Sequence, residues 1–150
     1  MGLPILQVLT HDSIGVGADG PTHQPIEQLT MLRSIPNFRV FRPADAKEII
    51  GSWNEILNNP KPSAIVISRN SSTMLDNSNP NMISLGAYIV KREKSKLSAI
   101  LIATGTEVIT AINIANELEK DKIYLRVVSM PCMSLYESTD DTYKEKQEIT

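Results

Sequence analysis

Residue types that bind sugars and phosphates gather in one loop of this sequence and at one later position. His11, Asp19 and His23 share a polar, glycine-rich loop, and Arg69 follows a later apolar run. Histidine donates, accepts or carries a proton near neutral pH, aspartate accepts hydroxyl hydrogen bonds, and arginine donates two parallel bonds to phosphate. The combination suits a sugar hydroxyl, a carbonyl or a phosphate. The alternative is a solvated loop in which Asp12 and Asp19 only stabilise turns.

Two other ligand classes are disfavoured for this loop. Its two histidines and two aspartates are metal-ligand types, but their order matches no compact zinc signature, so we expect no metal site. Residues 15–20 match G-x-G-x-x-G, the pattern of a dinucleotide site. That site needs its glycines directly between a strand and a helix, whereas Pro21 follows the third glycine here. We expect these glycines to let the loop fold close to another segment.

The single cysteine limits both redox chemistry and location. Cys132 follows Pro131 and has no histidine nearby in sequence, which favours a structural thiol over a nucleophile. One cysteine excludes an internal disulfide and is typical of a reducing compartment. No apolar run approaches the roughly 18 residues of a membrane span, and the N-terminus lacks a signal-peptide pattern. We therefore expect a cytoplasmic location and no membrane partner.

The charge balance disfavours nucleic-acid partners. The 150 residues include 15 Lys and Arg and 17 Asp and Glu, for a net charge of −2. Such a balance gives no broad electrostatic attraction to a polyanion. With only two Phe and one Trp, the chain also lacks an aromatic platform for single strands.

The first half of the chain alternates predicted strands and helices. Apolar runs predict strands at 4–9, 38–41 and 63–68. Helical spacing predicts a helix over 25–35 that buries Ile26, Leu29 and Leu32. Asp45 and Glu48 have capping-box spacing. The helix they open has one apolar face, made of Ile49, Ile50, Trp53, Ile56 and Leu57.

The second half repeats this alternation after an Asn-, Ser- and Pro-rich stretch at 70–84, which holds little that could pack and is interpreted as a linker. Strands are predicted at 85–90, 99–103 and 124–130. Thr104 and Glu107 suggest a second capping box, opening a helix that places Val108, Ala111, Ile112, Ala115 and Leu118 on one face. A polar helical end is predicted over 140–149.

This order implies an α/β fold with flanking helices on parallel sheets. We expect modules at 1–69 and 85–150 with the linker 70–84 between them. Both modules should be incomplete, since sheets of this class usually have about five or six strands. Ligands of such sheets bind beyond the carboxyl ends of the strands. The polar segments expected there are 10–12, 69–70 and 104–106.

Several motifs give the chain a resemblance to a known family. They are THDSIG at 10–15, DGPTHQPIEQL at 19–29, LRSIPN at 32–37, FRPAD at 41–45, AIVISR at 64–69, IATGTEV at 102–108 and RVVSMP at 126–131. Together they resemble the transketolase signature, in order, over nearly the whole chain. The related 1-deoxyxylulose-5-phosphate synthases share some of these motifs. They do not typically carry THDSIG or QPIEQ, so transketolase is favoured.

The resemblance implies a thiamine-diphosphate-enzyme fold and a function. Transketolases form homodimers and use thiamine diphosphate with Mg or Ca to move a two-carbon ketol unit between phosphorylated ketose and aldose sugars, in the pentose phosphate pathway. It implies that His11 and Arg69 hold the substrate phosphate. It also implies that Asp19 contacts a sugar hydroxyl, and that His23 is a catalytic residue at the reacting end of the sugar.

The resemblance also implies which parts of such a site fall outside this sequence. The glutamate that activates the aminopyrimidine ring, the aromatic pocket around that ring and the Gly-Asp-Gly metal motif have no counterpart here. The cofactor-binding residues are therefore unknown, and we expect the isolated chain to be inactive. Two function classes stay open: part of an active transketolase, or a noncatalytic or binding fragment of the same fold.

Overall fold

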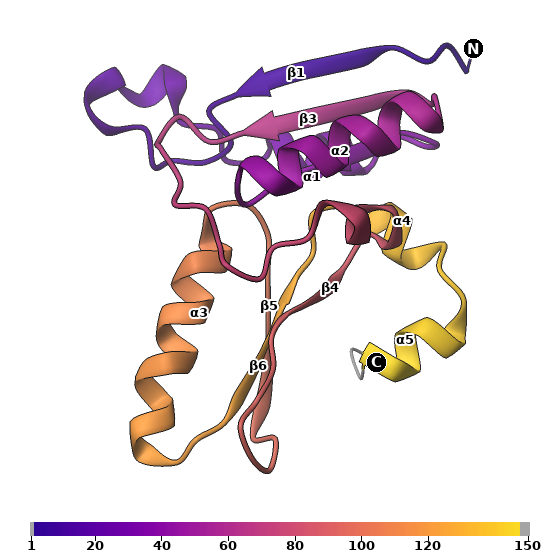
Figure 1. The fold of residues 1–150 in the computed structure, drawn as a ribbon. Coiled ribbons are helices and arrows are strands. Elements are labelled where there is room, and N and C mark those ends of the chain that lie inside the picture. The colour runs from indigo at the N-terminus through magenta and orange to yellow at the C-terminus, as the bar shows by residue number, and fades with distance from the viewer. Residues whose placement is uncertain (1, 148–150) are drawn as a thin grey trace.

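Three parallel strands form the first sheet of the structure, a computed structural model that describes residues 2–147 (Figure 1). Their order across the sheet is β1 (Leu6–Thr10), β3 (Ser63–Ile67) and β2 (Arg39–Phe41). Thr10 pairs with Ile67, so the carboxyl ends of β1 and β3 are level. The residues that follow these two strands therefore emerge at the same edge of the sheet.

Helices cover both faces of this sheet because alternate strand residues point to opposite sides. On one face Val40, Ala64 and Val66 pack with Leu32 of α1 (Gln28–Arg33). On the other face, Phe41 and Ile65 belong to the same core cluster as Ile56 of α2 (Ala46–Asn58). The apolar run of β3 is buried from both sides, as its sequence predicts.

The start of α2 confirms its predicted cap. The Asp45 carboxylate accepts a hydrogen bond from the Glu48 backbone N–H at 3.0 Å. The Glu48 carboxylate reaches back to the N–H of Ala44 at 2.7 Å, one residue before the cap. The first bond satisfies an N–H group that a helix start leaves without an intrahelical partner, and the second ties the residue before the cap to the helix.

The apolar residues predicted to share a face on each of the first two helices are only partly buried. Ile26 is 82% exposed, because α1 begins only at Gln28. In α2, Ile56 is buried, but Ile50, Trp53 and Leu57 are exposed. The buried residues of this helix are Glu48, Gly51, Ser52 and Ile56. The helix lies between the first sheet and the second half of the chain (Figure 1). Most of its buried residues are therefore polar or small.

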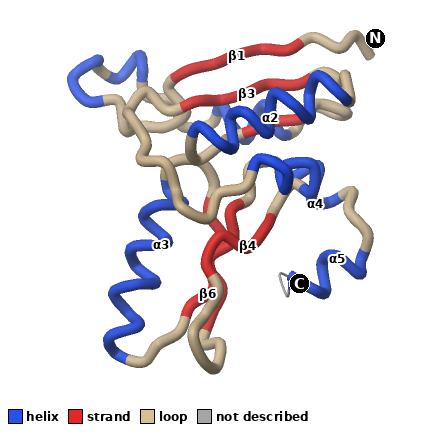
Figure 2. Tube along the Cα trace, viewed as in Figure 1, coloured by secondary structure: helices blue, strands red, loops and turns tan. Residues whose placement is uncertain are grey.

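The second sheet is mixed rather than parallel. Its order is β4 (Tyr88–Lys91), β6 (Leu125–Ser129) and β5 (Ala99–Ala103). Strand β5 runs parallel to β6, while β4 runs antiparallel to it. Helix α3 (Glu107–Leu118) packs on β5 and β6 through its buried residues Val108, Ala111 and Ala115. Figure 2 shows the two sets of strands and the helices beside them.

The predicted capping box at α3 is wrong. The N-cap residue is Thr106, and its side chain makes no capping hydrogen bond. The Thr104 hydroxyl donates to the backbone carbonyl of Arg42 at 3.2 Å, and Glu107 pairs with the Arg42 guanidinium. Both predicted capping residues therefore serve a contact between the two halves of the chain.

The remaining elements are short. Helix α4 (Met133–Glu137) has no counterpart among the predicted elements, and α5 (Asp141–Gln147) covers most of the predicted end. Positions 148 and 149 of that predicted helix lie outside the described residues. The 3-10 turns are η1 (Gly17–Asp19), η2 (Pro21–His23), η3 (Pro80–Leu85) and η4 (Glu119–Asp121). No helix in the part of the chain that the structure describes has the length and apolar character to cross a membrane.

The stretch 70–84 packs more than its composition predicts. Leu75, Ser78 and Ile83 are buried, and η3 lies against α2. The Asp45 carboxylate accepts hydrogen bonds from the Leu75 N–H at 2.9 Å and from the Ser78 hydroxyl at 2.5 Å. The expectation that this stretch holds little that could pack is therefore wrong: a few apolar and hydroxyl side chains anchor it.

One continuous core joins the two halves. Its buried members from the first half include Phe41, Ile56 and Ile65, and those from the second half include Val108 and Val127. At this boundary the fully buried Glu48 carboxylate accepts hydrogen bonds from the hydroxyls of Tyr88 and Ser129. Burial raises the pKa of Glu48.

Candidate functional site

The end of β1 presents His11 in an unusual backbone conformation. Its φ is 64°, one of three positive values at non-glycine residues in the described chain. The Thr10 hydroxyl lies 2.9 Å from its Nδ1. This fixes the ring orientation and leaves Nε2 pointing away from Thr10. The left-handed region is sparsely populated by residues other than glycine, so its occurrence here marks a position held by its surroundings.

Asp19 brings His11 and Arg69 together. Asp19 Oδ2 lies 3.8 Å from Nε2 of His11 and 3.4 Å from Nε of Arg69. The side chain of Asp19 is 34% exposed, that of His11 25% and that of Arg69 53%, so solvent and small molecules can reach all three. Two groups that can be cationic thus converge on one acceptor position, as the strand ends of β1 and β3 predict.

His23, the last residue of η2, lies beside His11. Its ring centroid lies 5.7 Å from that of His11, with the rings tilted by 51°. The Thr22 hydroxyl lies 3.2 Å from Nδ1 of His23. Both histidines line an open cavity of about 430 Å³ whose apolar wall includes Leu9 and Val66. All four residues that the sequence singles out therefore lie in one region, while their roles stay predictions.

The glycine-rich loop folds as expected against another segment. The Asn70 side-chain amide donates to the Gly15 carbonyl. Gly17 and Gly20 have φ values of 72° and 85°, which favour glycine. The loop continues into η1 and η2 rather than opening a long helix from a strand, so it lacks the context of a dinucleotide site.

The described residues form no metal-ligating group. No cluster of three or more His, Cys, Asp or Glu side chains occurs within 2–147 in an arrangement that could hold an ion. The histidines and aspartates of the loop are used differently: Asp19 faces His11, while Asp12 is buried and turned toward Arg42.

Arg42 is the residue of this region that sequence reasoning missed. Its guanidinium contacts Asp12, Thr104 and Glu107, so the polar segment 104–106 binds this arginine rather than the cavity. The available signal was FRPAD at 41–45, which marks the family but does not show the partner. Those partners lie 30 or more positions away in the sequence.

Cys132 lies in the protein interior. Its side chain is buried and free, and burial raises the pKa of the thiol. The Ser134 hydroxyl is its hydrogen-bonding neighbour, 3.6 Å from Sγ. A buried thiol with a raised pKa is a poor nucleophile, which agrees with a structural role.

Two family models match the chain. The first, Transketolase, pyrimidine binding domain, matches residues 1–73, and the second, Transketolase-like TK C-terminal domain, matches residues 86–147. A probable transketolase of Streptococcus pneumoniae is 44% identical over 146 residues, which is 97% of this chain and 22% of that protein. The chain thus spans about a fifth of the length of the curated relatives it matches.

Solved structures agree with these matches. Transketolase from Leishmania mexicana superposes with a TM-score of 0.89 at 39% identity, covering 96% of this chain and 21% of that one. Transketolase from Pichia stipitis in complex with sedoheptulose 7-phosphate superposes at 0.90 and 36% identity, with the same coverage. The α/β fold is therefore of the thiamine-diphosphate-enzyme type, and the chain belongs to the transketolase family.

Proposed function

We propose that this chain supplies the sugar-phosphate-binding part of a transketolase, which transfers a two-carbon ketol unit between phosphorylated ketose and aldose sugars in the pentose phosphate pathway. The observation that carries the proposal is the convergence of His11 and Arg69 on one oxygen of Asp19, beside the cavity that His23 lines. The sugar phosphate bound in the Pichia stipitis relative supports the same class of ligand.

Each side chain has a role that its chemistry suits. Arg69 and His11 bind the phosphate, because an arginine fork and an imidazole N–H donate to phosphate oxygens. Asp19 accepts a hydrogen bond from a sugar hydroxyl once the phosphate has taken its place between the two cationic groups. His23 lies toward the cavity and hydrogen-bonds the reacting end of the sugar, where it can hold or pass a proton.

Thiamine diphosphate belongs to the proposed whole protein, with a divalent ion, Mg or Ca. The residues in 2–147 do not fit its diphosphate–metal end, since they include no three-ligand group. The cofactor carries the carbanion chemistry of this family, and no step of it is assigned to the residues of this chain. We further propose that the whole protein is a cytoplasmic homodimer, and that residues 1–69 and 85–150 belong to separate domains joined by 70–84.

A replacement experiment tests this proposal. The chain replaces the matching segment of the full-length Streptococcus pneumoniae relative, with which it shares 44% identity. We expect the hybrid enzyme to transfer ketol units from a ketose phosphate, and His11→Ala or Arg69→Ala to raise the KM for phosphorylated substrates. A hybrid that folds and binds thiamine diphosphate but transfers nothing would favour the noncatalytic alternative.

A further inference from the structure

Arg42 has an unusually complete set of partners. It follows the carboxyl end of β2, and its side chain is 7% exposed. Nε and Nη2 donate to Oδ2 of Asp12 at 2.8 and 2.7 Å. Nη1 donates to the Thr104 carbonyl at 3.0 Å and to Oε2 of Glu107 at 2.7 Å. One guanidinium therefore connects the loop after β1 with the start of α3 in the second half.

The second half also encloses the Arg42 backbone. Its N–H donates to the Pro131 carbonyl at 2.8 Å, and its carbonyl accepts from the Gly105 N–H at 3.0 Å. Gly105 has a φ of 62°, and a Cβ at this position would lie 2.8 Å from Nε of Arg42. Only glycine suits both the backbone angle and the close approach. The segments after β5 and β6 thus build the socket in which Arg42 is fixed.

His11 comes directly before Asp12, the partner of Arg42, and its backbone conformation needs to be held in place. A positive φ at a residue with a side chain persists only where the structure on both sides determines it. On one side Thr10 is held in β1 by pairing with Ile67. On the other side Asp12 is held by Arg42, and its side chain is 2% exposed. Without that second anchor, His11 is free to relax to an extended conformation that turns its ring away from Asp19 and Arg69.

We propose that Arg42 is a positioning residue that holds His11 through Asp12, and that the second half of the chain thereby acts on the sugar-phosphate site. The consequence for ligand binding rests on the proposed function; the effect on the His11 backbone does not. The competing explanation is a buried ion pair that stabilises the fold without any effect on the site.

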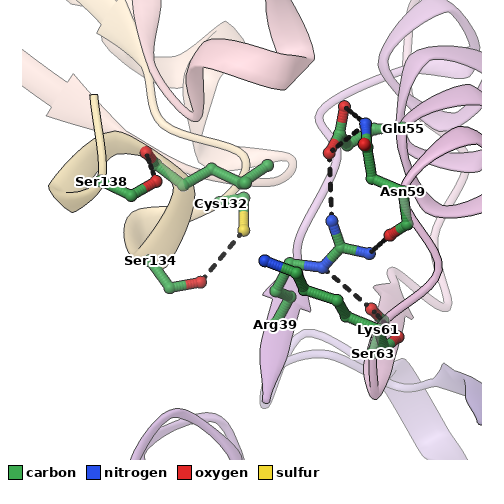
Figure 3. A network of polar contacts seen from close by, with 9 residues as sticks. Arg39, Glu55, Asn59, Lys61, Ser63, Cys132, Ser134 and Ser138 are labelled. Atoms are coloured by element: carbon green, nitrogen blue, oxygen red, sulfur yellow. Dashed lines mark hydrogen bonds and ion pairs between the residues drawn. The ribbon is translucent and has the colours of Figure 1, made fainter. Parts of the chain in front are cut away.

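Arg39 provides a matched control, because it sits at the opposite end of the same strand. Its side chain is also 7% exposed. It donates to Glu55 Oε1 at 3.0 Å, to the Asn59 carbonyl at 2.6 Å and to the Ser63 hydroxyl at 3.2 Å, as Figure 3 shows. Each of these partners lies away from the loop after β1. Loss of this fork should lower stability about as much, without changing His11.

The experiment compares Arg42→Lys, Asp12→Asn and Arg39→Lys in the complete 150-residue chain. Lysine keeps the positive charge, so attraction of phosphate is unchanged, but it lacks the arginine fork. NMR reports the positive φ of His11 through its backbone shifts and couplings, and titration with inorganic phosphate gives affinity. Denaturation midpoints show how far each variant is destabilised.

We expect Arg42→Lys and Asp12→Asn to lose the positive-φ signature and to bind phosphate about tenfold more weakly, as when a hydrogen bond to a charged group is lost. Arg39→Lys should keep both. Asp12→Asn is informative because it removes a negative charge, which by itself would strengthen phosphate binding. It also carries the test if Arg42→Lys fails to fold.

The outcomes separate the two proposals. Retention of the His11 signature in Arg42→Lys, or its equal loss in Arg39→Lys, would overturn the positioning role. If the unchanged chain binds no phosphate but Arg42→Lys still alters the His11 backbone, the positioning role stands and the proposed ligand is wrong.

Discussion

At the scale of single residues, Asp19 and Arg69 should divide the recognition of the sugar. Arg69 offers a donor fork that suits phosphate, whereas the Asp19 carboxylate is an acceptor that suits a sugar hydroxyl and would repel phosphate. In the hybrid enzyme, Arg69→Ala should raise KM for phosphorylated substrates about tenfold or more, whatever their stereochemistry. Asp19→Ala should mainly weaken discrimination between epimeric acceptors. Steady-state kinetics with two epimers measures both effects, and identical profiles would rule out this division.

Glu48 should make the stability of the chain depend on pH. Burial is the main cause that raises the pKa of Glu48 above its ordinary value of 4.5. Between pH 4.5 and the pKa of the folded state, Glu48 therefore keeps a proton in the folded chain that it has lost in the unfolded chain. The free energy of unfolding is therefore highest near or below pH 4.5 as far as this group is concerned. It falls as pH rises towards the folded-state pKa, by up to about 1.4 kcal/mol per pH unit.

Glu48→Gln removes the titrating group, so this fall with rising pH should disappear. Urea unfolding at a series of pH values gives the slope directly. Glu117→Gln is the control, because Glu117 is 72% exposed and pairs with Lys120 three residues later in the chain. A slope that persists in Glu48→Gln would show that another group causes it.

At the scale of elements, the contact between α2 and η3 depends on Gly51. A Cβ there would come closer than 3.0 Å to Ile83 and to the Pro80 backbone. Alanine is more favourable than glycine in a helix by about 1 kcal/mol. The steric overlap of its Cβ with Ile83 and Pro80 should outweigh this gain. Gly51→Ala should lower the free energy of unfolding by about 1–3 kcal/mol.

Asn54→Ala in the same helix tests propensity alone, because Asn54 is exposed. It should leave stability unchanged or slightly raised when both variants are unfolded in urea. Equal effects of the two substitutions would show that the α2–η3 contact is looser than the structure indicates.

Most elements could be predicted because their signals are local. The continuous apolar run of β3 and the cap at Asp45 are visible within a few residues, and both occur as predicted. The convergence of His11 and Arg69 follows from parallel strands with level ends. The direction of β4 could not be predicted, because a strand's apolar pattern is the same whichever way it runs.

The remaining errors concern long-range partners. The apolar face predicted for α2 includes Trp53, which is exposed, because helical spacing shows which residues share a face but not whether another element covers it. Arg42 was missed for the same reason. An arginine finds Asp12 and Glu107 through the fold, and neither spacing nor composition marks such a pair.

At the scale of the whole molecule, the uncovered apolar residues predict self-association. Ile50, Trp53 and Leu57 form an exposed stripe on α2. Val8 is exposed on the edge strand β1, and Ile5 is exposed just before that strand. Exposed edge strands and apolar stripes are typical association surfaces. Sedimentation of the purified chain should reveal oligomers or aggregates at high concentration.

Leu57→Lys should reduce this association, because it places a charge within the stripe. Met74→Lys is the matched control: Met74 is 60% exposed but lies outside that stripe. A well-dispersed monomer at high concentration, for the unchanged chain, would contradict the prediction and show a self-sufficient unit.

The core shared by the two halves has a consequence for recombination. Two separate family models match the chain, one at 1–73 and the other at 86–147. The core, however, places side chains such as Phe41 and Val127 from both domains in one cluster. A hybrid that exchanges only one half combines core side chains from two different proteins. Such a hybrid should unfold at a lower temperature than one that exchanges both halves together. We therefore expect the two matched regions to unfold as one cooperative unit.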